Sequence, residues 1–127
     1  MAKQAIRTDN APSPGGAYSQ AWRAGDFVYT AGMGANDPAT GALVGDTIEA
    51  QTRQTLDNIQ AALAAAGATL ADVVKVTTHL SDLSLFAGYN AVYATYFAEP
   101  RPSRTTVGSQ LAKGMLIEID VVAYLGA

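Results

Sequence analysis

The sequence predicts a mixed fold, α+β or α/β, in which one β-sheet carries two helices on the same face. Three observations indicate this. Two segments place apolar residues at helical spacing, five shorter segments are rich in strand-forming residues, and the expected elements follow the order β-β-α-β-α-β-β. With 127 residues the chain has room for one modest core, so we expect a single domain over residues 1–127.

The N-terminal part is predicted to be a loop followed by two short strands. Residues 10–16 are rich in proline and glycine and indicate the loop. Ser19–Arg23 and Phe27–Ala31 flank a glycine-containing turn and are expected to pair. Asp37–Gly41 has the composition of a second turn, after which Leu43-Val44 extends a short edge strand.

The first helix has clear start and stop signals. Asp46 is a good N-cap, and Glu49 three residues later completes a capping box. The apolar stripe that follows consists of Ile48, Thr52, Leu56, Ile59 and Leu63. Gly67 is expected to end the helix as the residue after its C-cap.

The second half of the chain is predicted as strand, helix and two strands. Val73–Leu80 is rich in β-branched residues, and Ser81–Ser84 forms a turn that can cap a second helix. That helix runs to about Phe97 and carries an aromatic stripe, most simply explained as core packing. The stripe consists of Phe86, Tyr89, Tyr93, Tyr96 and Phe97. Prolines at 100 and 102 stop the helix, and strands over Arg104–Ser109 and Met115–Leu125 follow.

The last strand has two different faces. One face is uniformly apolar and should lie under the helices: Ile117, Ile119, Val121, Ala123 and Leu125. The other mixes apolar residues with two carboxylates: Leu116, Glu118, Asp120, Val122 and Tyr124. Two helices cover only one face, and the second is too apolar for open solvent, so we expect another subunit to cover it and to bring Glu118 to an interface.

The composition limits the classes of function. Only 15% of the residues are charged and the net charge is −3, so electrostatics do not favour binding to nucleic acid or to an anionic membrane. The chain contains no cysteine, which excludes disulfides, thiol nucleophiles and thiolate metal sites. Met1–Ala5 shows no long apolar run, so we expect no signal peptide and a cytoplasmic protein.

Two charged residues in predicted strands are the best candidates for chemistry. Arg104 follows a proline-rich turn, and a guanidinium can hold a carboxylate through two parallel hydrogen bonds. Glu118 lies in an apolar strand, where a carboxylate can act on water as a general base. Each also has a simpler interpretation as half of an ion pair, and the two could pair with each other.

The remaining candidates are weaker. His79 is the single histidine, which favours a structural histidine over a metal ligand. Its predicted strand face also carries Val73, Lys75 and Thr77. Ser19 lacks a Gly-x-Ser-x-Gly elbow, and Gly32-Met33-Gly34 is too short for a dinucleotide fingerprint. Asn90 lies beside the aromatic stripe, where a buried amide must be hydrogen-bonded and so orients something.

Several segments together resemble one family. They are Ala11-Pro12 with Gly16–Ala21, Gln51-Thr52 with Leu56–Ile59, Val73–Thr77, Asp82-Leu83 with residues of the second helix, Pro102-Ser103-Arg104, and Ile117-Glu118-Ile119. These segments span nearly the whole chain in order. On them the chain resembles the RidA/YjgF family, the Rid enamine and imine deaminases.

This resemblance implies a chorismate-mutase-like α+β fold and a barrel-like homotrimer with one site in each cleft between subunits. It implies that Arg104 binds the carboxylate of a 2-imino or 2-enamino acid and that Glu118 activates the attacking water. Further pocket residues implied by the resemblance are Tyr18, Asn90, Ala31, Gly32 and Thr106. The implied reaction, of the 2-iminobutanoate/2-iminopropanoate type, gives 2-oxo acids and ammonia without a cofactor or metal.

The chain departs from the family pattern around the expected pocket. Ala17 replaces a typical proline, Ala31-Gly32-Met33 stands where Ser-Gly-Gln is frequent, and Thr106 stands where cysteine or valine is frequent. Ala31 and Met33 make the expected pocket less polar. Two alternatives therefore stay open: a pathway-specific Rid deaminase or hydrolase acting on a larger enamine, of the aminomuconate or aminoacrylate type, and a non-enzymatic metabolite-binding or chaperone-like trimer.

Overall fold

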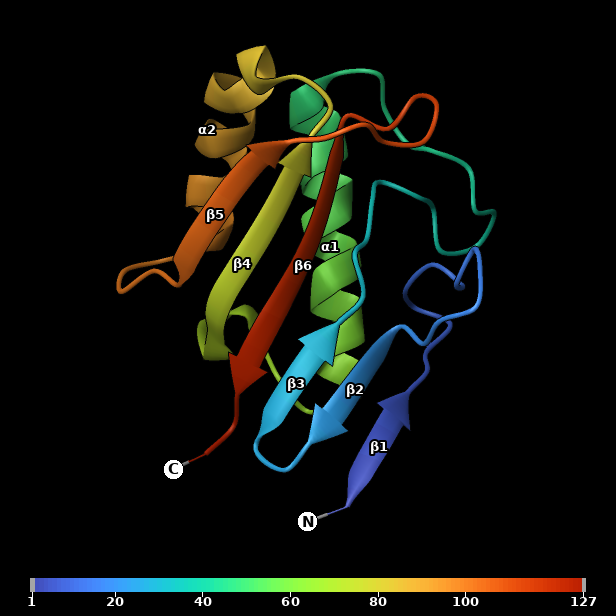
Figure 1. The fold of residues 1–127 in the computed structure, drawn as a ribbon, viewed down its shortest axis with the longest axis vertical. Coiled ribbons are helices and arrows are strands. Elements are labelled where there is room, and N and C mark those ends of the chain that lie inside the picture. The colour runs from blue at the N-terminus through green and yellow to red at the C-terminus, as the bar shows by residue number, and fades with distance from the viewer. Residues whose placement is uncertain (1, 127) are drawn as a thin grey trace.

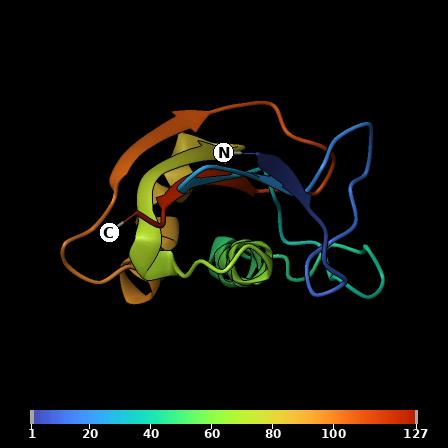
Figure 2. The same ribbon diagram turned by 90° about the horizontal axis from the view of Figure 1, so that it is seen from below.

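The computed structural model describes residues 2–126 and has an α+β fold. Within these residues, six strands form one sheet in the order β1-β2-β3-β6-β4-β5, in which only β4 and β5 pair in parallel. The strands are β1 (Lys3–Ile6), β2 (Ala21–Ala24), β3 (Phe27–Thr30), β4 (Val73–Leu80), β5 (Ser103–Gly108) and β6 (Ile117–Tyr124). Two helices, α1 (Ile48–Ala65) and α2 (Phe86–Tyr96), lie on one face of this sheet, as predicted (Figures 1 and 2).

The strand predictions hold except at the N-terminus. β4 has the predicted bounds, and the ends of the other predicted strands differ by at most two residues. β1 was missed because only Ile6 of its four residues is buried, so it lacks an apolar pattern. It forms by pairing with β2, where Ile6 lies opposite Ala21. The predicted edge strand at Leu43-Val44 is reduced to one isolated bridge between Leu43 and Asn36.

Helix α1 begins one residue later than predicted. Its N-cap is Thr47, whose Oγ1 accepts a hydrogen bond from the Ala50 N–H at 3.2 Å, so the capping box of Asp46 and Glu49 was wrong. Both residue types cap helices well, and the sequence pattern does not decide between adjacent positions. The C-terminal prediction is confirmed, since Gly67 has a φ of 82°, a left-handed conformation that favours glycine.

The core fills the space between the helices and one sheet face. The predicted stripe of α1 is buried, and so are Ile117, Ile119, Val121 and Ala123 of β6, while Leu125 is only half-buried. Val73 of β4 also points into the core, contrary to the face predicted for it. A register irregularity between Val73 and Lys75 reverses the alternation there.

The opposite sheet face is open, because no helix or strand of residues 2–126 covers it (Figure 2). Several large aromatic side chains on strands of this sheet are exposed: Trp22, Phe27, Tyr29 and Tyr124. Glu118 and Asp120 also alternate onto this face, since their neighbours Ile117, Ile119 and Val121 are in the core. No helix in the described region is long and apolar enough to cross a membrane.

Candidate functional site

Arg104 lies on the helix-covered face of the sheet, at its β5 edge. Its partner on β4 is the fully buried Val76, and its guanidinium reaches the aromatic stripe of α2. The guanidinium carbon is 4.6 Å from the Tyr93 ring centroid and 5.4 Å from those of Phe86 and Tyr89. Stacking of this kind favours the cation and restricts its orientation.

A hydrogen bond completes the hold on Arg104. Its Nη1 donates to Asn90 Oδ1 at 2.8 Å. Asn90 is half-buried rather than buried, but it has the hydrogen bond that was expected of it. This bond uses one of five guanidinium N–H groups and leaves donors for a bidentate contact with a carboxylate. Arg104 and Asn90 line a cavity of about 420 Å³. Tyr93 also lines it, and burial raises the pKa of its phenol to about 12.

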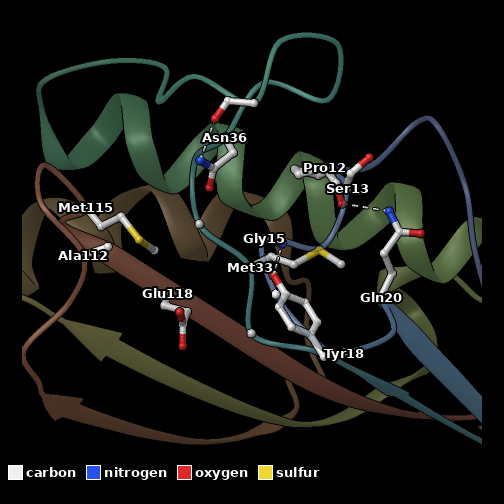
Figure 3. Close-up of a pocket in the computed structure, with 14 residues that line it drawn as sticks. Pro12, Ser13, Gly15, Tyr18, Gln20, Met33, Asn36, Ala112, Met115 and Glu118 are labelled. Atoms are coloured by element: carbon white, nitrogen blue, oxygen red, sulfur yellow. Dashed lines mark hydrogen bonds between the residues drawn. The ribbon is translucent and has the colours of Figure 1, made fainter.

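Glu118 borders a second cavity, of about 490 Å³, which is lined mainly by residues of the segments 12–20 and 32–36 (Figure 3). Its side chain lies on the sheet face opposite to that of Arg104. Its carboxylate lies against the backbone of Gly32, where a Cβ atom would be 2.7 Å from Glu118 Oε2. Tyr18, Met33 and Met115 line the same cavity. The cavity that Glu118 borders is thus also lined by an aromatic ring and two thioether side chains.

The loop that closes this cavity is fixed by a buried glutamine. Gln20 is only 2% exposed, and its Nε2 donates to the carbonyl oxygens of Ala11 and Pro12 at 3.2 and 2.8 Å. Within the loop, the Gly15 N–H donates to Tyr18 Oη at 3.0 Å. These bonds hold the Tyr18 ring at the cavity without help from regular secondary structure.

Two buried amide side chains of α1 hold the backbone of other segments near the cavity. Asn58 Nδ2 donates to the carbonyl oxygens of Gly34 and Asn36 at 2.9 and 2.8 Å. Gln51 Nε2 donates to Gly114 O at 3.0 Å, and its Oε1 accepts from the Leu116 N–H at 2.9 Å. The sequence reasoning missed Gln20, Gln51 and Asn58. A signal existed for the last two, which lie seven residues apart beside the apolar stripe of α1.

The predicted site residues thus form two groups within one chain. Tyr18, Gly32 and Glu118 border one cavity, whereas Asn90 and Arg104 border another. Thr106 shares the Arg104 face, with its Oγ1 3.3 Å from Tyr89 Oη, and Ala31 lines neither cavity. Arg104 and Glu118 do not pair with each other. The ion pairs among residues 2–126 are Arg7–Asp9 and Arg101–Glu99.

The open face near Glu118 carries a second carboxylate and the single histidine. Burial raises the pKa of Asp120, and the neighbouring Lys75 and His79 side chains oppose that shift. His79 lies opposite Glu118 on β4, and its Nδ1 is 2.7 Å from Ser109 Oγ. This hydrogen bond gives His79 the structural partner that the sequence reasoning expected.

The chain matches known proteins along nearly its whole length. The family model described as Endoribonuclease L-PSP matches residues 8–125. The chain belongs to this family, which is the RidA/YjgF family. A RutC family protein of Pyrococcus horikoshii is 52% identical over 96% of this chain and 98% of its own.

Two further RidA/YjgF members bear on chemistry. The 2-iminobutanoate/2-iminopropanoate deaminase of Salmonella typhimurium is 41% identical over 93% of this chain and 94% of its own. The crystal structure of TdcF of E. coli, solved with bound serine, superposes with a TM-score of 0.90 at 34% identity. The match covers 97% of this chain and 99% of TdcF, so the RidA/YjgF fold is shared throughout.

Proposed function

We propose that this protein is a hydrolytic deaminase that converts reactive 2-imino and 2-enamino acids into 2-oxo acids and ammonia. Each active site would join Arg104 of one chain to Glu118 of another in a homotrimer. The observation that carries this proposal is that Arg104 and Glu118 are separated within one chain. A pre-positioned guanidinium and a cavity-facing carboxylate occupy opposite faces of one sheet, so a common cleft requires two chains. The open sheet face with its exposed aromatic side chains supports an interface.

The proposed chemistry uses only water and these side chains. Arg104 binds the substrate carboxylate and thereby places the electrophilic imine carbon in the cleft. Glu118 accepts a proton as a water oxygen bonds to that carbon, and the C=N double bond becomes a single bond. Glu118 then returns this proton to nitrogen, which gives a carbinolamine. In the second half of the reaction Glu118 takes the hydroxyl proton and passes it to the amino nitrogen, so the C–N bond breaks, ammonia leaves and the C=O bond of the 2-oxo acid forms. Atoms balance as imine plus water giving 2-oxo acid plus ammonia.

Relatives support the substrate class. The Salmonella relative is named for deamination of 2-iminobutanoate and 2-iminopropanoate, and TdcF was solved with serine, an amino acid with an α-carboxylate. In the alternative of a non-enzymatic trimer, the same cleft would bind 2-oxo acids without turning over an imine.

The decisive test generates imines in the presence of the protein. An amino-acid oxidase acting on a series of amino acids supplies imines that differ only in side chain, and their loss is followed against the spontaneous rate. We expect acceleration for at least part of the series. No acceleration for any side chain, together with saturable binding of 2-oxobutanoate, would select the binding protein instead.

The cavity beside Glu118 favours larger apolar side chains. Met33, 7% exposed, and Met115 line it with adaptable apolar surface. We therefore expect kcat/KM to rise about tenfold or more from the alanine-derived to the leucine- or methionine-derived imine.

A matched variant separates this preference from the chemistry. Met115→Gln keeps the length of the side chain but makes the cavity wall polar, so it should reduce the preference and leave turnover of the alanine-derived imine within about threefold. Equal rates across the series in the unmodified protein would contradict the preference and leave the deaminase proposal standing.

Gly32 offers a direct test of the carboxylate's position. In Gly32→Ala the new Cβ would lie 2.7 Å from Glu118 Oε2, so the carboxylate must move while the backbone can stay. Displacement of a reacting group by about 1 Å can cost about 100-fold, which is the loss in kcat/KM that we expect. Gly108→Ala is the control, because its Cβ would approach no atom closer than 3.4 Å, the distance to Leu83 Cγ. Unchanged kcat/KM in Gly32→Ala would argue against the placement of Glu118.

A further inference from the structure

A row of three hydroxyl groups lies behind Arg104 and has no part in the chemistry above. Thr78 of β4 and Tyr89 of α2 are both fully buried, and Thr78 Oγ1 lies 2.8 Å from Tyr89 Oη. Tyr89 Oη lies 3.3 Å from Oγ1 of the half-buried Thr106 on β5. Valine and phenylalanine would fill the same space without a desolvation cost, so these buried hydroxyls call for an explanation.

The row ends at Thr106, two residues along β5 from Arg104. Thr78 and Thr106 are direct partners across the parallel strands β4 and β5, and Thr106 follows Arg104 by two residues on the same sheet face. The ring of Tyr89 also lies 5.4 Å from the Arg104 guanidinium carbon. Tyr89 therefore touches both the cation and the hydroxyl next to it.

The number of hydroxyl hydrogens determines which group donates in each of the two hydrogen bonds. Tyr89 has one hydroxyl hydrogen and lies between two threonine oxygens. If Tyr89 donated to Thr78, the hydroxyl hydrogen of the buried Thr78 would need another acceptor. Within residues 2–126, Tyr89 is the one group that forms a side-chain hydrogen bond with Thr78. If Thr78 donates to Tyr89 and Tyr89 donates to Thr106, both buried hydrogens are satisfied. The Thr106 hydrogen is then free to point outward at an anion.

We propose that Tyr89 is a positioning residue that orients the Thr106 hydroxyl to donate to the substrate carboxylate held by Arg104. Thr78 fixes the direction of the row by donating to Tyr89. Each donation polarises the next hydroxyl, so the outer one becomes a better donor to an anion. This inference rests on the proposed function, because it takes the ligand at Arg104 to be a carboxylate.

The test removes the phenol oxygen while keeping the ring. Tyr89→Phe retains the contact with Arg104, so we expect KM for the preferred imine and Kd for 2-oxobutanoate to rise about five- to tenfold with kcat unchanged. Thr106→Val should give the same increase, and the double variant should show no further increase, because both changes remove one donor. Thr106→Ser should restore wild-type values.

A control on the same helix separates this from general destabilisation. Tyr96→Phe also removes a tyrosine hydrogen bond, from Tyr96 Oη to Asp57 Oδ1 at 2.9 Å, and should leave KM and Kd unchanged. Equal Kd and KM in Tyr89→Phe and wild type, additive effects of Tyr89→Phe and Thr106→Val, or a fall in kcat alone would each overturn the proposal.

Measuring the Kd for 2-oxobutanoate separates a failure of the deaminase proposal from a failure of the role proposed for Tyr89. If the wild-type protein binds 2-oxobutanoate but hydrolyses no imine, the deaminase proposal fails, and the Kd values of the variants still decide the role of Tyr89. If the wild-type protein hydrolyses imines and Tyr89→Phe binds normally, only the role of Tyr89 is refuted. If the wild-type protein does not bind 2-oxobutanoate, the role proposed for Tyr89 is refuted as well.

Discussion

Replacing Arg104 with lysine should lower kcat/KM for imine hydrolysis about 100-fold or more, chiefly through KM. The positive charge is kept, but a lysine cannot form two parallel hydrogen bonds to a carboxylate. It also lacks the planar group that lies 4.6 Å from the Tyr93 ring and that donates to Asn90. A 100-fold loss in kcat/KM corresponds to about 2.7 kcal/mol, since each tenfold change is about 1.36 kcal/mol.

Steady-state kinetics with the preferred imine and calorimetric binding of 2-oxobutanoate measure the effect. Arg23→Lys is the matched control, because Arg23 donates to the Gly25 carbonyl oxygen in the β2–β3 turn, away from both cavities. Full activity of Arg104→Lys would mean that a point charge suffices and that the stacked, forked geometry has no function.

The sequence could predict the elements whose pattern is local. The stripe of α1 and the two faces of β6 repeat at fixed spacing, so burial follows directly from the residue types. β1 could not be found in this way, because a short edge strand forms through its pairing with β2 rather than through its own apolar pattern. The sequence also does not indicate that Thr47 rather than Asp46 is the N-cap, since threonine and aspartate are both favoured at that position.

The candidate site was predictable in its residues but not in its arrangement. Arg104 and Glu118 stand out by type and position, yet whether they share a sheet face depends on how β5 and β6 each pair with β4. The contact of Arg104 with α2 and the amide bonds from Gln51 and Asn58 to distant loops arise only from tertiary packing. The spacing of Gln51 and Asn58 could have indicated that they face inward, but no periodicity in the sequence indicates which distant backbone groups they bind.

Replacing Glu118 with glutamine should lower kcat about 10²- to 10⁴-fold, the usual contribution of a positioned acid-base group. Glutamine keeps the shape that packs against Gly32 but cannot accept a proton from water, so KM should stay within about threefold. Asp120→Asn is the control, because it removes the other carboxylate of the same strand face. If Asp120→Asn were the more damaging change, Glu118 would not be the acid-base group.

Co-expression of the Arg104→Lys and Glu118→Gln chains then tests whether each site spans two chains. In a mixed oligomer, some clefts take Glu118 from an Arg104→Lys chain and Arg104 from a Glu118→Gln chain. Such a cleft contains both wild-type residues. Random assembly from equal amounts makes about one quarter of the clefts of this kind, so activity should return to about one quarter of the wild-type value. A site formed within one chain would stay inactive in every mixture, because each chain lacks one of the two groups. The opposite sheet faces occupied by Arg104 and Glu118 favour recovery, and the fraction recovered measures how many clefts combine two chains.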